Sequence, residues 1–241
     1  MGIYRRAFLA ACAFTLAPVT GVDAADFRIP PAQVVPVPSP IPVPDYNLWY
    51  LRGDISWAHH EDPDISVAGA PFSGEEMDDT WAFGGGFGYV YNDRIRGDIT
   101  IDHRLDADVT GTDTTTGSTH TAELSSTVFL ANVYYDVRRW ESFSPYLGVG
   151  LGFTSNDTGN RTITTGGVQT GATGGNGDTD FAFAAMAGVS IPIRDGWLFD
   201  AGYRYLNLGD AKTDAAGSVS VMGIGDIQAH EFRFGVRYEF R

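Results

Sequence analysis

The chain has 241 residues, a formal net charge of −14 and a single cysteine, Cys12. The acidic balance argues against nucleic acid as a partner, because binding to phosphates requires clustered cations. A lone cysteine excludes a disulfide framework and a cysteine–zinc site. Lysine occurs once, at Lys212, and every other positive side chain is an arginine, which suits fixed, forked pairing with carboxylates in confined places.

Residues 1–24 are predicted to be an export signal peptide. Arg5 and Arg6 form its positive start, the apolar stretch AFLAACAFTLAPV follows, and Val22-Asp23-Ala24 supplies small residues at the cleavage positions. RRAFLA resembles a twin-arginine signal, but no cofactor motif follows it. LAAC resembles a lipoprotein cleavage box, but the apolar run continues past the cysteine.

Residues 25–46 are predicted to be a proline-rich periplasmic linker. The stretch 29–45 holds seven prolines in seventeen residues and almost no charge, which is typical of an extended polyproline II spacer. The alternative is a tether or docking strip for a periplasmic partner.

From residue 47 onward, apolar and polar residues alternate with the period of a β-strand. Eight such segments occur, at 49–59, 80–91, 95–105, 122–137, 145–154, 181–191, 197–207 and 228–240. Three connections are short, at 92–94, 138–144 and 192–196, and four are long, at 60–79, 106–121, 155–180 and 208–227. Short turns alternating with long loops predict that residues 47–241 form an all-β domain, an eight-stranded antiparallel up-and-down barrel that spans a membrane, with its turns in the periplasm.

The two faces of each segment differ in chemistry, and one face carries too much aromatic bulk for a surface in water. We therefore expect this face to meet lipid, with aromatic girdles at its edges. The girdle residues are Trp49, Tyr89, Tyr91, Tyr135 and Trp197 near the turns, and Trp57 and Trp81 near the loops.

The opposite faces carry arginines and carboxylates in near balance. An eight-stranded barrel is only wide enough for side chains to fill it, and an unpaired buried charge costs several kcal/mol. We therefore predict a charge network in the lumen, with glycines on inward positions supplying room. The predicted network consists of Arg52, Asp54, Arg96, Asp98, Asp102, Arg104, Asp136, Asp200, Arg204, Glu231, Arg233, Arg237 and Glu239.

Four stretches carry a resemblance to a known family: VFLANVYYDV (128–137), PYLGVGLGF (145–153), LFDAGYRYLNLGD (198–210) and HEFRFGVRYEF (230–240). Together they resemble the small eight-stranded outer-membrane β-barrel family, often called the porin family, which includes opacity-type surface proteins of bacteria. The resemblance implies localisation to the outer membrane and a C-terminal aromatic signal that the barrel-assembly machinery reads. Tyr238 and Phe240 match that signal, although Arg241 follows where the family usually ends on an aromatic residue.

Motifs for catalysis and cofactor binding are weak. GGGFG (84–88) and GVGLG (148–152) have glycine spacing like that of a nucleotide loop, but a following helix and acid are missing, so inward packing is the better interpretation. Ser118 and His120 lie in a predicted flexible loop, which is a poor place for catalytic geometry. We expect no enzymatic activity, no cofactor and no catalytic or metal site.

Two groups of loop-side residues leave alternatives open. His59, His60, His103 and His230 are expected at strand ends as polar boundary residues, with haem or metal binding at the rim as the alternative. The first long loop is acidic and has no calcium-loop spacing, so it is expected to be solvated. Its alternative role is to bind lipopolysaccharide phosphates through divalent cations. The third long loop, 155–180, is rich in Gly and Thr and is expected to be mobile.

The favoured function is a structural and surface-display role, in which the barrel supports the envelope and its loops face the exterior, for example as an adhesin. A narrow diffusion channel for small solutes is the alternative, and an enzyme is a third hypothesis. Expected partners are outer-membrane lipids, lipopolysaccharide and the barrel-assembly machinery.

Overall fold

The computed structural model describes residues 48–240 except 69, 71, 139 and 216–219. The predicted signal peptide (1–24) and linker (25–46) therefore lie outside the described residues. All regular structure in the described part is β. No helix of that part is long and apolar enough to cross a membrane.

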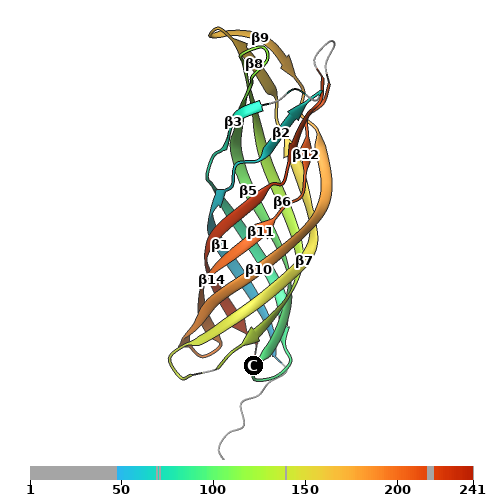
Figure 1. The fold of residues 1–241 in the computed structure, drawn as a ribbon. Helices are drawn as coiled ribbons and strands as arrows, with labels where there is room; N and C mark the ends of the chain where they lie inside the picture. The colour runs from blue at the N-terminus through green and yellow to red at the C-terminus, as the bar shows by residue number, and fades with distance from the viewer. Residues whose placement is uncertain (1–47, 69, 71, 139, 216–219, 241) are drawn as a thin grey trace, which may run out of the picture. The chain divides into compact units, whose positions relative to one another are not determined.

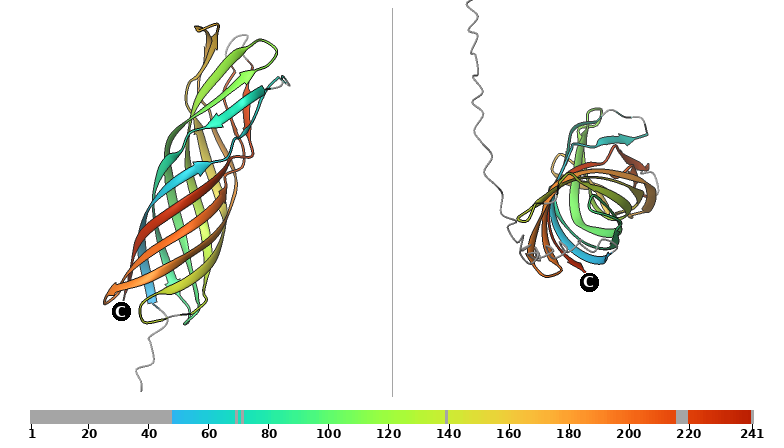
Figure 2. Two further views of the ribbon diagram at one scale, coloured as in Figure 1. Left: turned by 60° about the vertical axis from the view of Figure 1, so that its left-hand side comes forward. Right: turned by 90° about the horizontal axis from the view of Figure 1, so that it is seen from below.

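Eight long strands form a closed ring (Figures 1 and 2). They are β1 (Leu48–His60), β4 (Thr80–Val90), β5 (Ile95–Asp113), β6 (Ser118–Asp136), β7 (Ser144–Thr158), β10 (Gly177–Arg194), β11 (Trp197–Asn207) and β14 (Gln228–Glu239). Each strand pairs antiparallel with the next along the chain, and β14 pairs with β1, so the sheet closes on itself. The predicted eight-stranded up-and-down barrel is confirmed.

The outward face of the ring is apolar, as the alternation predicts. Along β14, Phe232, Phe234 and Val236 are 41–51% exposed, whereas Glu231, Arg233 and Arg237 between them are buried. Trp49, Tyr91 and Trp81 are exposed near the two ends of the ring, where the aromatic girdles were expected. A belt of this kind suits a lipid environment and would be unfavourable in water.

Four ring strands, β5, β6, β7 and β10, run further at their loop-side ends than predicted. Residues 106–121 were expected to be a loop, and that prediction was wrong: β5 continues to Asp113, and β6 begins at Ser118. A β-bulge between Arg104 and Ala107 is the physical reason. Below the bulge the even-numbered residues of β5 are buried, whereas above it Ala107 and Val109 are buried and Asp108 is exposed.

The other long connections also contain strands. They are β2 (Asp64–Val67), β3 (Phe72–Met77), β8 (Arg161–Thr165), β9 (Val168–Thr173), β12 (Ala211–Lys212) and β13 (Met222–Gly225). β8 and β9 form a hairpin that pairs with β6, so the third long loop carries regular structure that its Gly/Thr-rich composition did not suggest. β2, β13 and β12 form a separate small sheet.

We call these additions and the extended ends of the ring strands (60–79, 105–126, 155–180 and 208–227) the outer cap. The cap has its own apolar core, in which Val109, Leu124, Met222, Ile224 and Ile227 are at most 1% exposed. Side-chain amides and hydroxyls also bind the segments of the cap to one another. Asn156 on β7, for example, donates to the carbonyl oxygens of Leu208 at 3.1 Å and Asp210 at 3.0 Å.

Candidate functional site

The polar face of the ring points into the lumen and carries all thirteen residues of the predicted charge network. No side chain of this set is more than 9% exposed. Alternate residues of a strand point to opposite faces, so the parity that puts aromatic residues on lipid also puts these charges inside.

The group nearest the outer cap is a set of alternating charges. Arg204 Nε donates to Glu231 Oε2 at 2.5 Å, and its Nη1 donates to Asp102 Oδ2 at 2.8 Å. Arg104 donates to the other oxygen of Glu231, and Arg233 Nη2 lies 3.2 Å from Asp102 Oδ1. These contacts join β5 to β11 and β14 across the lumen.

The middle of the lumen continues the same chain of ion pairs. Arg233 Nη2 also lies 3.3 Å from Asp54 Oδ2, and Arg52 pairs with Asp54 through two hydrogen bonds of 2.7 and 2.8 Å. Arg52 Nη1 then donates to Asp98 Oδ2 at 3.2 Å. Each charge has an opposite neighbour, which offsets the cost of removing it from water.

A third group lies toward the short turns. Arg96 Nε is 3.4 Å from Asp136 Oδ1, and Arg237 Nε is 3.6 Å from Asp200 Oδ2 and 3.8 Å from Glu239 Oε1. The last two distances are long for hydrogen bonds, so this group is held more loosely than the outer one.

Tyrosines complete the lumen, and the sequence-based prediction missed them. The Arg96 guanidinium lies over the rings of Tyr134 and Tyr146, 4.2 and 4.7 Å from their centroids, a cation–π arrangement. Tyr50 donates to Asp98 at 2.9 Å. The sequence did contain a signal for them: Tyr50 is two residues from Arg52, and Tyr134 is two residues from Asp136, so each tyrosine lies on the inward face of its strand. Their rings need space, and a Cβ at Gly88 would overlap the ring of Tyr50.

Buried apolar side chains form a partial layer at the cap end of the lumen, here called the apolar layer, which the buried polar residues Thr80 and Ser126 interrupt. Ala58, Ala182, Leu206, Leu208 and Ala229 are all 0% exposed. Ala58 pairs in register with Glu231, and Leu206 with Ala229, so the layer lies directly beyond the outermost ion pairs. Ions crossing the barrel would have to shed water here, which is costly.

His59, His60 and His230 lie near loop-side strand ends, as expected, whereas the expectation was wrong for His103, which lies inside β5 because that strand runs on to Asp113. His59 Nδ1 is 2.6 Å from Asp79 Oδ1, and His230 lies between Glu61 at 2.6 Å and Tyr203 at 2.5 Å. Among the described residues, no three or more His, Cys, Asp or Glu side chains are grouped so that they could hold a metal ion.

Ser118 and His120 lie in strand β6 and not in a flexible loop, so that expectation was wrong. Ser118 Oγ is 2.7 Å from Thr165 Oγ1, and His120 Nδ1 is 3.0 Å from Arg161 Nη2. Arginine can only donate, so Nδ1 of His120 accepts and the ring is neutral. Burial and the neighbouring Arg161 lower the pKa of His120.

A closed antiparallel ring with an apolar exterior and an ion-paired interior defines an integral membrane β-barrel. Comparison with known proteins agrees. The chain belongs to the outer membrane protein β-barrel domain family, whose model matches residues 42–240. The protein is therefore an integral protein of the outer membrane.

Individual relatives support the same class. An uncharacterized protein of Brucella abortus strain 2308 is 28% identical over 256 residues, covering 86% of this chain and 89% of the relative. Outer membrane protein PagN of Salmonella typhimurium is 29% identical over 124 residues, covering 49% of this chain and 51% of PagN.

Two solved structures share the fold at low identity. The outer membrane protein OprG from Pseudomonas aeruginosa has a TM-score of 0.55 at 16% identity, covering 81% of this chain and 97% of OprG. The outer membrane protein AlkL has a TM-score of 0.50 at 18% identity, covering 84% of this chain and 95% of AlkL.

Proposed function

We propose that this protein anchors and displays a folded acidic cap on the outer face of the outer membrane, and contributes to the integrity of the envelope. The observation that carries the proposal is the cap. Loops that merely connect strands need no core of their own, whereas here Val109, Leu124, Met222, Ile224 and Ile227 are buried beyond the apolar belt. A folded element on the exposed side of an anchor is suited to contact with the exterior.

The charge of the chain is concentrated in this cap. Its segments contain seventeen Asp and Glu residues but only Arg161 and Lys212 as Lys or Arg, so their net charge is −15, against −14 for the whole chain. Such a surface favours cationic partners. We include lipopolysaccharide among the proposed partners, with divalent cations linking its phosphates to acidic residues such as Glu75 and Glu76. Nucleic acid is not proposed as a partner, because its phosphates carry the same sign of charge as the cap.

The lumen supports an anchoring role over the alternative of a diffusion channel. Its ion pairs cross the interior, and buried apolar side chains lie at the end next to the cap. No enzymatic role is proposed: Ser118 and His120, the pair considered from the sequence, make separate contacts, with Thr165 and Arg161.

Cysteine labelling on intact cells tests the display of the cap. The only cysteine is Cys12, in the predicted signal peptide, so an introduced cysteine is a clean probe. Val168→Cys, at a position 65% exposed on β9, should react with a membrane-impermeant maleimide. Asp195→Cys, in a turn at the opposite end of the barrel, is the matched control and should react only after the outer membrane is permeabilised. The reverse pattern would contradict the proposed orientation.

A further inference from the structure

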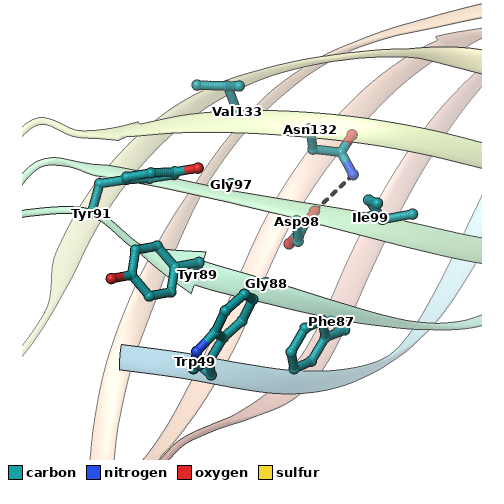
Figure 3. Close-up of a pocket in the computed structure, with 10 residues that line it drawn as sticks. All are labelled: Trp49, Phe87, Gly88, Tyr89, Tyr91, Gly97, Asp98, Ile99, Asn132 and Val133. Atoms are coloured by element: carbon teal, nitrogen blue, oxygen red, sulfur yellow. Dashed lines mark hydrogen bonds between the residues drawn. The ribbon is translucent and has the colours of Figure 1, made fainter. Parts of the chain in front are cut away.

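A hollow on the lipid-facing side of the barrel lies close to the periplasmic turns (Figure 3). Its volume is about 600 Å³, and its lining includes Trp49, Phe87, Tyr91, Ile99 and Val133. These side chains are 48–69% exposed, so the hollow opens outward.

A glycine creates the hollow. Gly97 on β5 pairs with Tyr89 on β4 and with Val133 on β6, so it lies between two outward-facing side chains and has none itself. Figure 3 shows Tyr89 and Trp49 on one side of Gly97 and Val133 on the other. The missing side chain leaves a slot with apolar walls between neighbouring strands.

One wall of the slot is a packed aromatic surface. Trp49 stacks on Phe87 with ring centroids 4.8 Å apart and an interplanar angle of 9°, and it contacts Tyr89 at 4.8 Å. Tyr91 meets Tyr89 edge-on at 4.9 Å. Rings that support one another in this way form a preorganised apolar surface that loses little side-chain entropy on binding.

A cation lies at the turn end of the slot. Arg94 follows Tyr91 in the β4–β5 turn, and its Nη1 donates to Tyr135 Oη at 3.1 Å, which holds the guanidinium beside the lipid-facing surface. Asp93 lies 3.7 Å from Arg94 Nε, but the two side chains are 55% and 59% exposed, so water weakens that pair. The guanidinium therefore remains open to a phosphate.

We propose that this slot binds one anionic glycerophospholipid of the periplasmic leaflet, with an acyl chain against Gly97 and Trp49 and the phosphate at Arg94. The depth fits, because aromatic girdles mark the level of the headgroups. The charge also fits: guanidinium pairs well with phosphate, and each such cation near a membrane surface adds to the attraction of anionic lipids.

Fluorescence quenching by brominated lipids tests the proposal. The full mature protein is made with Trp49 as its sole tryptophan, through Trp57→Phe, Trp81→Phe, Trp140→Phe and Trp197→Phe. It is reconstituted in phosphatidylcholine vesicles that contain dibromo-phosphatidylglycerol or dibromo-phosphatidylcholine. We expect Trp49 to prefer the phosphatidylglycerol by roughly two- to five-fold in relative binding constant. In Arg94→Gln this preference should fall to about one.

Two matched variants complete the experiment. Arg194→Gln removes an exposed arginine at the end of β10, beside the β10–β11 turn, and should leave the preference for phosphatidylglycerol intact. If Arg194→Gln lost as much of this preference as Arg94→Gln, the preference would arise from general surface charge, and the proposal would be overturned. Val133→Phe fills the slot and should weaken quenching by both lipids, whereas Leu151→Phe, on the lipid-facing side of β7, should not.

Two further outcomes would also overturn the proposal. One is equal quenching by both lipids in the protein that retains Arg94. The other is a dimer of the unchanged protein in sedimentation that becomes a monomer in Val133→Phe. That result would make the slot an interface between two copies of the chain. Heat-modifiable migration on gels verifies that each variant has folded.

Discussion

Arg204 is a fully buried arginine of the lumen with two close ionic contacts. It is 0% exposed and binds Glu231 and Asp102 at 2.5 and 2.8 Å. Replacing it with alanine leaves two carboxylates with one arginine partner each, so Arg204→Ala should lower the free energy of unfolding by about 3–5 kcal/mol if the site stays dry. Urea unfolding in lipid vesicles measures this loss.

The same reasoning ranks other arginines. Arg233→Ala should also be destabilising, because Arg233 joins Asp54 to Asp102. Arg194→Ala, in an exposed turn, should change the free energy of unfolding little. If Arg194→Ala and Arg204→Ala had the same effect, the ion pairs of the lumen would not determine stability.

At the scale of strands, the sequence predicted the elements of the barrel well but their outer ends poorly. Period-two alternation identified all eight ring strands. One face of each strand meets lipid and the other meets charged side chains, so a shift of one residue would place every side chain in the wrong environment. The alternation fails at Leu105–Asp106, where the bulge reverses the parity and the environment outside changes from lipid to water. The cap core depends on contacts between residues far apart in sequence, such as Ile65 with Gly111, which no local pattern encodes.

The C-terminal strand carries the predicted assembly signal. Phe240 is 42% exposed on the lipid-facing side and packs edge-on against Tyr238 at 5.2 Å. Phe240→Ala should therefore reduce the yield of inserted barrel more than Arg241→Ala, measured as the heat-modifiable fraction in isolated outer membranes. Equal effects would mean that the assembly machinery does not read this aromatic pair.

The β8–β9 hairpin is held by a contact that should be sensitive to pH. Arg161 is 1% exposed and binds the neutral ring of His120, whose pKa burial and Arg161 lower. Asp113 opposes this shift, and Phe72 covers the ring edge-on at 5.1 Å. Because the pKa is lower in the folded state, the contact stabilises the hairpin above about pH 6.5 and is lost as the pH falls below that value.

Hydrogen exchange measures this dependence. Amides of residues 161–173 should exchange faster at pH 5 than at pH 7.5, after correction for the intrinsic rate, while amides of the ring strands should not. In His120→Phe the ring cannot ionise, so the excess exchange at pH 5 should disappear. Persistence of the excess in His120→Phe would assign the effect to other groups.

At the scale of the whole molecule, the interior determines whether solutes can pass. An eight-stranded ring leaves room for side chains and little else. In this barrel, the six arginines and seven carboxylates form ion pairs within the lumen, and Ala58, Leu206 and Ala229, all 0% exposed, lie at its cap end. We therefore expect small, infrequent conductance or none for the protein in planar lipid bilayers. Tyr203→Ala is the control, because Tyr203 is 37% exposed on the lipid-facing side and should not affect current. A steady pore of nanosiemens scale would contradict the filled lumen and favour a diffusion channel, because a current of that size needs a continuous column of water through the apolar layer.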